Sequence, residues 1–350
     1  MDSAAERRPR AAGEPLLSVR GLRTYFVQDE GVVKAVDGVD LDVYPGRVLG
    51  VVGESGCGKS VTARSILGLV ERPGRIVGGE IRLRRGARSG PAREVDLARL
   101  APDGPEIRSI RGAEIGLVFQ EPMASFSPVH TIGDQIAEAI VVHRRASPRD
   151  VRARAVALLR QVGVSRPEAR LDEYAHQLSG GLRQRAMIAM ALAGEPGLLI
   201  ADEPTTALDV TTQGQILDLL RRLQAERNMA VLLITHNLGV VAEMADDVAV
   251  MYLGRVVEDA PVDAIFHDPK HPYTQALLRS LPSVDAAPLT KLPTVSGAIP
   301  HPYHRPAGCP FHPRCPSAMP GLCDRDPPGE TAVAPGHRVR CFLYGRGEAS

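Results

Sequence analysis

Apolar and polar positions alternate near the start of the chain, over residues 16–26 and 31–44. This period of two predicts the strands of an antiparallel sheet. A short apolar run at 47–52 then ends in glycine, and residues 61–70 change to helical spacing. Strand, glycine-rich turn and helix in this order form the local structure that a phosphate-binding loop requires.

Further along the chain, apolar runs alternate with stretches of helical spacing. Buried strands are predicted at residues 115–119, 197–201 and 230–235. Helices are predicted over residues 131–164 (with a loop near Ser147), 212–226 and 238–245. Alternating strands and helices indicate the α/β class, with a parallel, doubly wound core.

Two parts of the chain lack this periodicity. Residues 84–106 are rich in Arg, Gly and Pro, and we expect them to form a surface excursion. After about Phe266 prolines recur and the periodicity fades. We therefore predict one domain over residues 16–265 and a small, loop-rich C-terminal module over residues 266–345.

Composition narrows the class of protein. Hydrophobic residues make up 44% and charged residues 24% of the 350, which is ordinary for a globular protein, and the net charge is +1. Such a charge gives no bulk field that would attract nucleic acid or an anionic membrane. No apolar run approaches the ~20 residues that span a bilayer, and the N-terminal residues lack the apolar core of a secretory signal. We expect a cytoplasmic chain that reaches a membrane only through partners.

Residues 53–60 fit the phosphate-loop pattern G-x-x-x-x-G-K-S/T at every fixed position. The glycines let backbone N–H groups point at phosphates, and the following helix adds its N-terminal dipole. Lys59 would reach the β- and γ-phosphates, and the Ser60 hydroxyl would reach Mg²⁺. At Cys57 we expect a small neutral filler rather than a redox role. ATP contacts are predicted at Gly53, Glu54, Ser55, Gly56, Cys57, Gly58, Lys59, Ser60 and Val61.

A pair of carboxylates follows the strand predicted at 197–201. Ligands of open α/β sheets bind at the carboxyl ends of the strands, which is where this pair lies. Asp202 is predicted to face Mg²⁺. Glu203 is predicted to be the general base that polarises the attacking water.

The segment Leu178-Ser-Gly-Gly-Leu-Arg-Gln-Arg185 resembles the signature motif of the ABC ATPases. The resemblance implies a P-loop ABC ATPase domain with a RecA-like parallel sheet core, an antiparallel β subdomain and an α-helical subdomain. It also implies that the motif closes over ATP held by an opposite subunit in a head-to-tail dimer. The trans contacts would come from Ser179, Gly180, Gly181, Gln184 and the D-loop residue Asp209. By its residue type, Ser179 is also expected to cap a helix from Leu182.

Other ABC elements match this sequence by position. Gln120 resembles the Q-loop glutamine, which contacts Mg²⁺ or the attacking water and couples the site to a transmembrane partner. His236 resembles the switch histidine near the γ-phosphate. The adenine-stacking aromatic should be Phe26, with Tyr25 as the alternative, because neighbours on a strand point to opposite faces. The resemblance implies Glu203, His236 and Gln120 as catalytic residues, and Ser60, Gln120 and Asp202 as Mg²⁺ ligands.

Several segments are similar to the dipeptide/oligopeptide/nickel import ATPases, namely residues 120–129, 131–135, 271–278 and 308–315. The resemblance implies the ATPase of a binding-protein-dependent importer, at the cytoplasmic face of the cell membrane. Its partners would be a second ABC ATPase (a heterodimer is favoured), two permease subunits and an extracellular substrate-binding protein, with no nucleic acid. Peptide is the favoured cargo, and nickel or another solute is the alternative. A ribosome- or DNA-directed ABC ATPase is disfavoured, because the chain has one ATPase domain and no sustained heptads.

Four of the five cysteines follow the pattern Cys309-x5-Cys315-x7-Cys323-x17-Cys341. Cytosolic thiols are kept reduced, so the group indicates metal binding rather than disulfides. Intervening prolines place the first three thiols on an irregular loop. A 4Fe–4S cluster is favoured, with structural zinc or unliganded thiols as alternatives, and the lack of a C-x2-C pair argues against an ordinary zinc ribbon. A stabilising role is favoured over a redox role.

Overall fold

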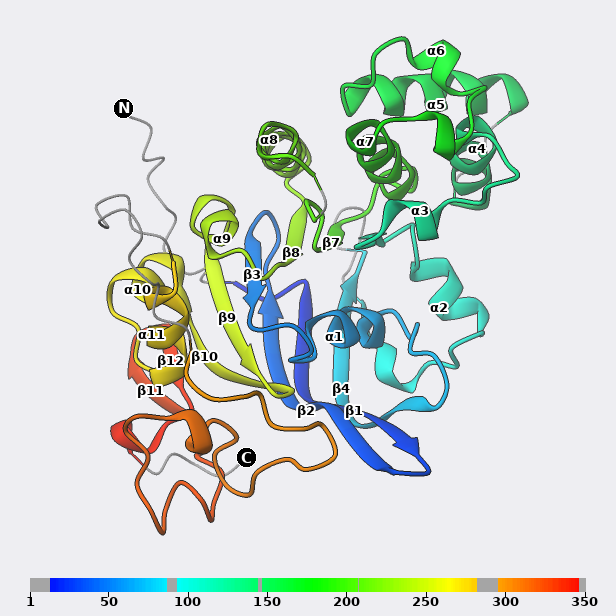
Figure 1. Ribbon diagram of the computed structural model, residues 1–350. Coiled ribbons are helices and arrows are strands. Elements are labelled where there is room, and N and C mark those ends of the chain that lie inside the picture. Colours follow the sequence, from blue (N-terminus) through cyan, green and yellow to red (C-terminus); the bar gives the residue numbers. More distant parts are fainter. Residues whose placement is uncertain (1–12, 87–92, 144–146, 207, 282–294, 346–350) are drawn as a thin grey trace.

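Two sheets form the body of the computed structural model, which describes residues 13–86, 93–143, 147–206, 208–281 and 295–345 (Figure 1). The antiparallel sheet has the order β2-β1-β4-β5 and the larger sheet has the order β11-β12-β10-β9-β3-β8-β7-β6. The first contains β1 Leu17–Gln28, β2 Gly31–Val43, β4 Gly74–Arg85 and β5 Arg93–Asp96. The second contains β3 Val48–Val52, β6 Ile115–Val118, β7 Leu198–Asp202, β8 Ala230–Ile234, β9 Asp247–Tyr252, β10 Arg255–Pro261, β11 Thr331–Ala334 and β12 His337–Val339.

Helices cover the larger sheet and form a separate layer beyond β6. In Figure 1, α4, α5, α6 and α7 gather at the upper right, with α3 below them. Among the described residues, no helix is long and apolar enough to cross a membrane. The helices are α1 Lys59–Ile66, α2 Pro105–Ile110, α3 Pro122–Ser125, α4 Ile132–His143, α5 Pro148–Gln161, α6 Pro167–Arg170, α7 Gly180–Ala191, α8 Val210–Arg227, α9 Leu238–Met244, α10 Val262–His267 and α11 Pro272–Arg279.

The central strands β9, β3, β8, β7 and β6 run parallel. Every residue of β3, β7 and β8 is buried, as expected of apolar runs that are covered on both faces of a parallel sheet. Register pairs both Val51 of β3 and Asp202 of β7 with Ile234 of β8. The loop after β3 and the carboxylates after β7 therefore lie at the same edge of the sheet.

The predicted α/β fold with its antiparallel sheet and helical layer is confirmed. Two expectations need correction. Residues 84–106 are only partly irregular, because β5 pairs with β4 and α2 begins at Pro105; residues 87–92 lie outside the described chain. The two sheets also contain more strands than expected, because β4, β5, β9, β10, β11 and β12 were not predicted.

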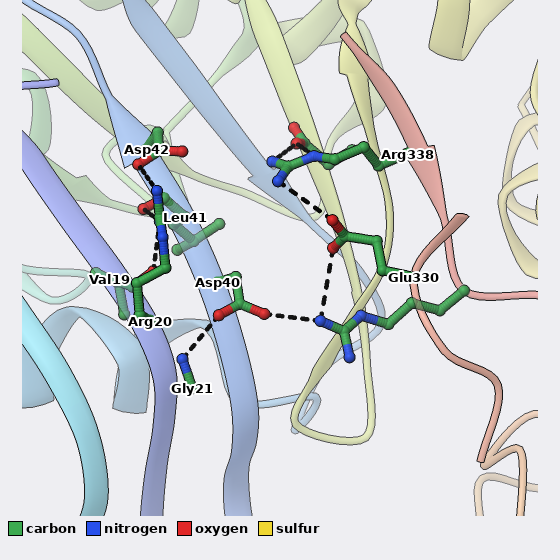
Figure 2. A network of polar contacts seen from close by, with 10 residues as sticks. Val19, Arg20, Gly21, Asp40, Leu41, Asp42, Glu330 and Arg338 are labelled. Carbon is green, nitrogen blue, oxygen red and sulfur yellow. Dashed lines mark hydrogen bonds and ion pairs between the residues drawn. The ribbon is translucent and has the colours of Figure 1, made fainter. Parts of the chain in front are cut away.

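The C-terminal region is joined to the larger sheet by strand pairing. In β12, Val339 lies opposite Glu258 of β10, and β11 then pairs with β12. Figure 2 shows polar contacts that extend this join to the antiparallel sheet: Glu330 contacts Arg338, and Asp40 accepts a hydrogen bond from the Gly21 N–H at 2.7 Å. Arg340 lies 2.7 Å from Asp40 and 3.5 Å from Glu330. A division between the two parts near residue 265 remains a prediction.

Candidate functional site

The loop between β3 and α1 has three glycines with positive φ, and at two of them a side chain would also clash. Gly53 has φ 153° and Gly58 has φ 104°. A Cβ at Gly53 would lie 2.2 Å from the Met251 carbonyl oxygen, and one at Gly58 would lie 2.2 Å from that of Ala35. The backbone can therefore pass close to its neighbours and leave the N-terminus of α1 open.

Lys59 lies inside the loop that it follows. Its side chain is buried, and its Nζ donates to the carbonyl oxygens of Gly53 at 2.8 Å and Glu54 at 3.1 Å. Around it, Ser55 and Gly56 are exposed at the turn, whereas Cys57 is buried. Burial raises the pKa of the Cys57 thiol, in keeping with a small neutral filler. The loop thus wraps a positive charge, as a phosphate site needs.

A hydroxyl and a carboxylate meet next to this loop. Ser60 Oγ, on α1, donates to Asp202 Oδ1, at the end of β7, at 2.9 Å. Burial raises the pKa of Asp202, and the nearby Glu203 adds to the rise, while the Ser60 hydrogen bond opposes it. Oxygen donors of this kind suit Mg²⁺, so the chemistry of the pair fits the predicted ion.

Glu203 is surrounded by three polar side chains from different segments. His236 Nδ1 lies 3.1 Å from Oε1, and Oε2 accepts hydrogen bonds from Gln120 Nε2 at 3.3 Å and Thr206 Oγ1 at 2.8 Å. Burial alone would raise the pKa of Glu203, but hydrogen bonds from His236 and Thr206 outweigh it and lower the pKa. Its carboxylate is therefore ionised near neutral pH. The structure brings together all three predicted catalytic residues.

Glu203 also has an unusual backbone. Its φ is 49°, in the left-handed region, and its N–H donates to the Ile234 carbonyl oxygen at 2.8 Å. Strain of this kind persists where surrounding structure fixes a functional side chain. Thr206 was not predicted as a site residue, although a hydroxyl three residues after the proposed base was a usable signal.

The two candidate adenine-stacking aromatics lie on β1, opposite β2. The Tyr25 hydroxyl donates to Asp37 Oδ1 at 2.6 Å, and burial together with that bond raises the pKa of Tyr25 to about 12. The Phe26 ring lies close to Gly74, where a Cβ would come within 2.5 Å of it. Both side chains are half-buried. The choice of Phe26 over Tyr25 stays a prediction.

The segment that resembles the signature motif begins α7. Ser179 is the N-cap, and its Oγ accepts from the Leu182 N–H at 3.4 Å, as expected. Ser179 and Gly180 are exposed and Gly181 is half-buried. Asp209 is also exposed and caps α8, accepting from the Thr212 N–H at 2.9 Å. Figure 1 shows α7 with the helical layer, apart from α1, so the motif presents an open surface.

Gln184 departs from its expected place. Its side chain is 2% exposed, within the buried face of α7, rather than on the open surface with Ser179. Successive helix residues turn by about 100°, so position 184 lies about 140° around the helix from position 179 and faces a different side. The trans contacts of Ser179, Gly180, Gly181, Gln184 and Asp209 stay predictions.

A pocket of about 360 Å³ lies between the loop after β6 and the start of α7. Its lining includes Gln120, Met123, Gly180 and Thr206. The Met123 side chain is half exposed. An exposed apolar side chain in the lining of a pocket is suited to contact with another protein.

The four C-terminal cysteines converge, as their pattern predicted. Cys309, Cys315, Cys323 and Cys341 line one cavity of about 20 Å³. The Met319 N–H donates to Cys323 Sγ at 3.4 Å, and backbone N–H groups of residues 311, 317 and 343 favour the thiolates of the other three. Burial nevertheless raises the pKa of Cys309 and of Cys341 to about 11.

The predicted iron–sulfur cluster is not supported by this geometry. Across the described ranges, no three His, Cys, Asp or Glu side chains are placed so that they could hold a metal ion. The donor set still fits a metal group by its chemistry, since four thiols share one cavity and each receives a backbone N–H.

Comparison with known proteins gives two family matches. Residues 36–206 match the family described as "ABC transporter", and residues 257–323 match "Oligopeptide/dipeptide transporter, C-terminal region". The oligopeptide transport ATP-binding protein AppD of Bacillus subtilis is 48% identical over 330 residues, covering 94% of this chain and 97% of AppD. The chain belongs to the ABC transporter family. The family and fold predicted from the sequence are therefore confirmed.

Two further similarities each cover most of the chain. The dipeptide transport ATP-binding protein DppD of Escherichia coli (strain K12) is 47% identical over 326 residues, covering 93% of this chain and 96% of DppD. Among solved structures, the ATP-binding cassette MJ0796, a dimer in a post-hydrolysis state with ADP and Pi, aligns with a TM-score of 0.61 and 27% identity. That alignment covers 70% of this chain and 98% of MJ0796.

Proposed function

We propose that this ABC transporter ATPase drives the import of di- or oligopeptides, from the cytoplasmic face of the cell membrane. The observation that carries the proposal for hydrolysis is the group of His236, Gln120 and Thr206 around Glu203. The peptide cargo is supported by the C-terminal region and by the names of AppD and DppD.

The chain's own residues divide the chemistry between them. The N–H groups of residues 53–58 and the Lys59 ammonium bind the phosphates of ATP. Ser60 and Asp202 would hold Mg²⁺, which neutralises charge on the phosphate oxygens when bound. Glu203 orients the attacking water and accepts its proton, while His236 holds the carboxylate in place beside the γ-phosphate.

The partners follow from surfaces that one chain leaves open. A second ABC ATPase, in a heterodimer, would present its own signature motif to this phosphate loop and receive Ser179, Gly180 and Gly181 in return. The pocket beside Gln120 and Met123 is the proposed contact with one of two permease subunits, and an extracellular binding protein would deliver the cargo. Exposure of the motif and of Met123 supports both contacts.

The test of hydrolysis is Glu203→Gln in the assembled transporter. The amide cannot accept a proton, so turnover should fall by about 10²- to 10⁴-fold, while ATP binding is retained. Phosphate release and nucleotide binding are measured on the same preparation. Hydrolysis at the wild-type rate would remove Glu203 from the role of base.

We also propose that Cys309, Cys315, Cys323 and Cys341 hold a 4Fe–4S cluster with a stabilising role, and that zinc is the alternative. The shared cavity and the N–H donors to sulfur support a metal group. The described residues contain no three ligands already placed to hold a metal ion, so the proposal depends on the chemistry of the four thiols and is decided by metal content.

Metal analysis of anaerobically purified protein tests this second proposal. Iron and sulfide should each approach about four per chain. The same measurement on Cys315→Ser should show most of both lost. Stoichiometric zinc, or no metal in the wild-type chain, would rule the cluster out.

A further inference from the structure

An ion pair joins the C-terminal module to the phosphate loop. Arg314 Nη1 lies 2.7 Å from Glu54 Oε2, and Nη2 lies 3.0 Å from Oε1. The two residues are 260 positions apart in the chain. Two parallel N–H···O bonds between a guanidinium and a carboxylate form the strong, bidentate type of ion pair. The Arg314 side chain is only 3% exposed, so little water screens this pair.

Arg314 is held in one position by other parts of the protein. Its Nε donates to the Ser296 carbonyl oxygen at 3.0 Å, and Nη2 donates to that of Val295 at 3.2 Å. The guanidinium also lies 5.8 Å from the centre of the Tyr252 ring and 6.0 Å from that of Phe311. With these contacts fixed, the fork that faces Glu54 is preorganised.

The backbone of Glu54 is held by the same region. The Glu54 N–H donates to the hydroxyl of Tyr273, on α11, at 2.9 Å. Tyr273 is fully buried and packs against Phe311 and Tyr252, with ring centres 5.3 and 4.7 Å away. The Glu54 carbonyl oxygen in turn accepts from Lys59 Nζ at 3.1 Å. One residue therefore links the module to the lysine that faces the phosphates.

The charge on Glu54 needs this partner. A carboxylate in the second position of a phosphate loop lies near the bound triphosphate, and like charges in a partly buried site repel strongly. A guanidinium that donates to both carboxylate oxygens offsets that repulsion and holds the carboxylate against the C-terminal module. Without Arg314, the carboxylate would be free to oppose ATP.

We propose that Arg314 is a positioning residue for ATP binding, through which the C-terminal module sets the affinity of the phosphate loop. The inference rests on the phosphate-loop assignment proposed above. It assigns to the module a role in the ATP site that its cysteines alone do not explain.

The test compares dissociation constants for a fluorescent, slowly hydrolysed ATP analogue, with Mg²⁺, on the full-length chain. Arg314→Gln should weaken binding by about tenfold, because it leaves the Glu54 carboxylate unpaired beside the phosphates. Adding Glu54→Gln to Arg314→Gln should restore binding to within about threefold of wild type, because the repelling charge is then gone. Arg325→Ala, which changes an exposed arginine of the same module, is the matched control and should bind as wild type.

Arg314→Lys provides a second variant if Arg314→Gln does not fold, since it keeps the charge but loses the bidentate fork. Its dissociation constant for the ATP analogue should rise by about threefold. In the assembled transporter, the KM for ATP should rise with these substitutions while kcat at saturating ATP is retained. Wild-type affinity for the ATP analogue in both Arg314→Gln and Arg314→Lys overturns the proposal. So does a folded double variant that stays as weak as Arg314→Gln.

Lys59→Ala separates this inference from the function on which it rests. Loss of binding in Lys59→Ala together with wild-type binding in Arg314→Gln would leave the phosphate loop in place and reject only the role of Arg314. Full binding in Lys59→Ala would reject the phosphate-loop assignment itself.

Discussion

At the scale of single residues, local patterns were enough to predict which groups would bind phosphate and magnesium. Lys59, Ser60 and Asp202 each occupy a fixed place relative to a strand end, and the structure brings Ser60 and Asp202 within 2.9 Å. The contact of Thr206 with Glu203 and the burial of Gln184 were not predicted. Both depend on how a turn or a helix face packs in three dimensions, which residue type does not reveal.

Thr206 supports a prediction about pH. Its hydroxyl donates to Glu203 and, with His236, holds the pKa of that carboxyl below its usual value. In Thr206→Val the pKa of Glu203 should rise, so the acid limb of the ATPase pH profile should move to higher pH. The acid limb is obtained by measuring ATP hydrolysis by the assembled transporter over a range of pH. Thr206→Ser keeps the hydroxyl and is the control; an acid limb that stays in place in the valine variant would show that Thr206 does not tune Glu203.

At the scale of elements, prediction worked where strands were uniformly apolar. β3, β7 and β8 were found because both their faces are buried. β10 was not found, because Glu258 and Asp259 interrupt its apolar pattern, yet they are 1% and 7% exposed. Burial of such charges depends on partners from distant segments, which a local pattern cannot show.

The same reasoning applies to β12, the strand that covers β10. It is three residues long and contains His337 and Arg338, so its sequence has no strand signal. His337 Nε2 lies 2.7 Å from Glu258 Oε1, and Arg338 forms an ion pair with Asp259. Polar side chains of β10 and β12 pair with one another, and this pairing allows Glu258 and Asp259 to be buried. Neither strand can be predicted from its own sequence alone.

At the scale of the whole molecule, Glu258 is the point where three parts of the chain meet. Besides His337 of β12, its carboxylate accepts the backbone N–H of Lys270 at 2.6 Å and of His271 at 2.9 Å, at the start of α11. α11 carries Tyr273, which holds the phosphate loop through Glu54. The buried carboxylate of Glu258 therefore both holds the C-terminal region in place and supports the helix that contacts the phosphate loop.

Glu258→Gln should therefore destabilise the full-length chain by about 3 kcal/mol, because a neutral amide cannot accept from all these donors. Burial raises the pKa of Glu258, but hydrogen bonds from His337 and from the two backbone N–H groups outweigh it and lower the pKa. A lowered carboxyl pKa adds stability above the unfolded pKa, and this stability is lost as pH falls through the folded value. The difference in free energy of unfolding between wild type and variant, measured by urea denaturation, should then shrink on acidification.

Glu138→Gln, at an exposed position of α4, is the control. A difference below about 1 kcal/mol between wild type and Glu258→Gln at neutral pH would contradict the anchoring role of Glu258.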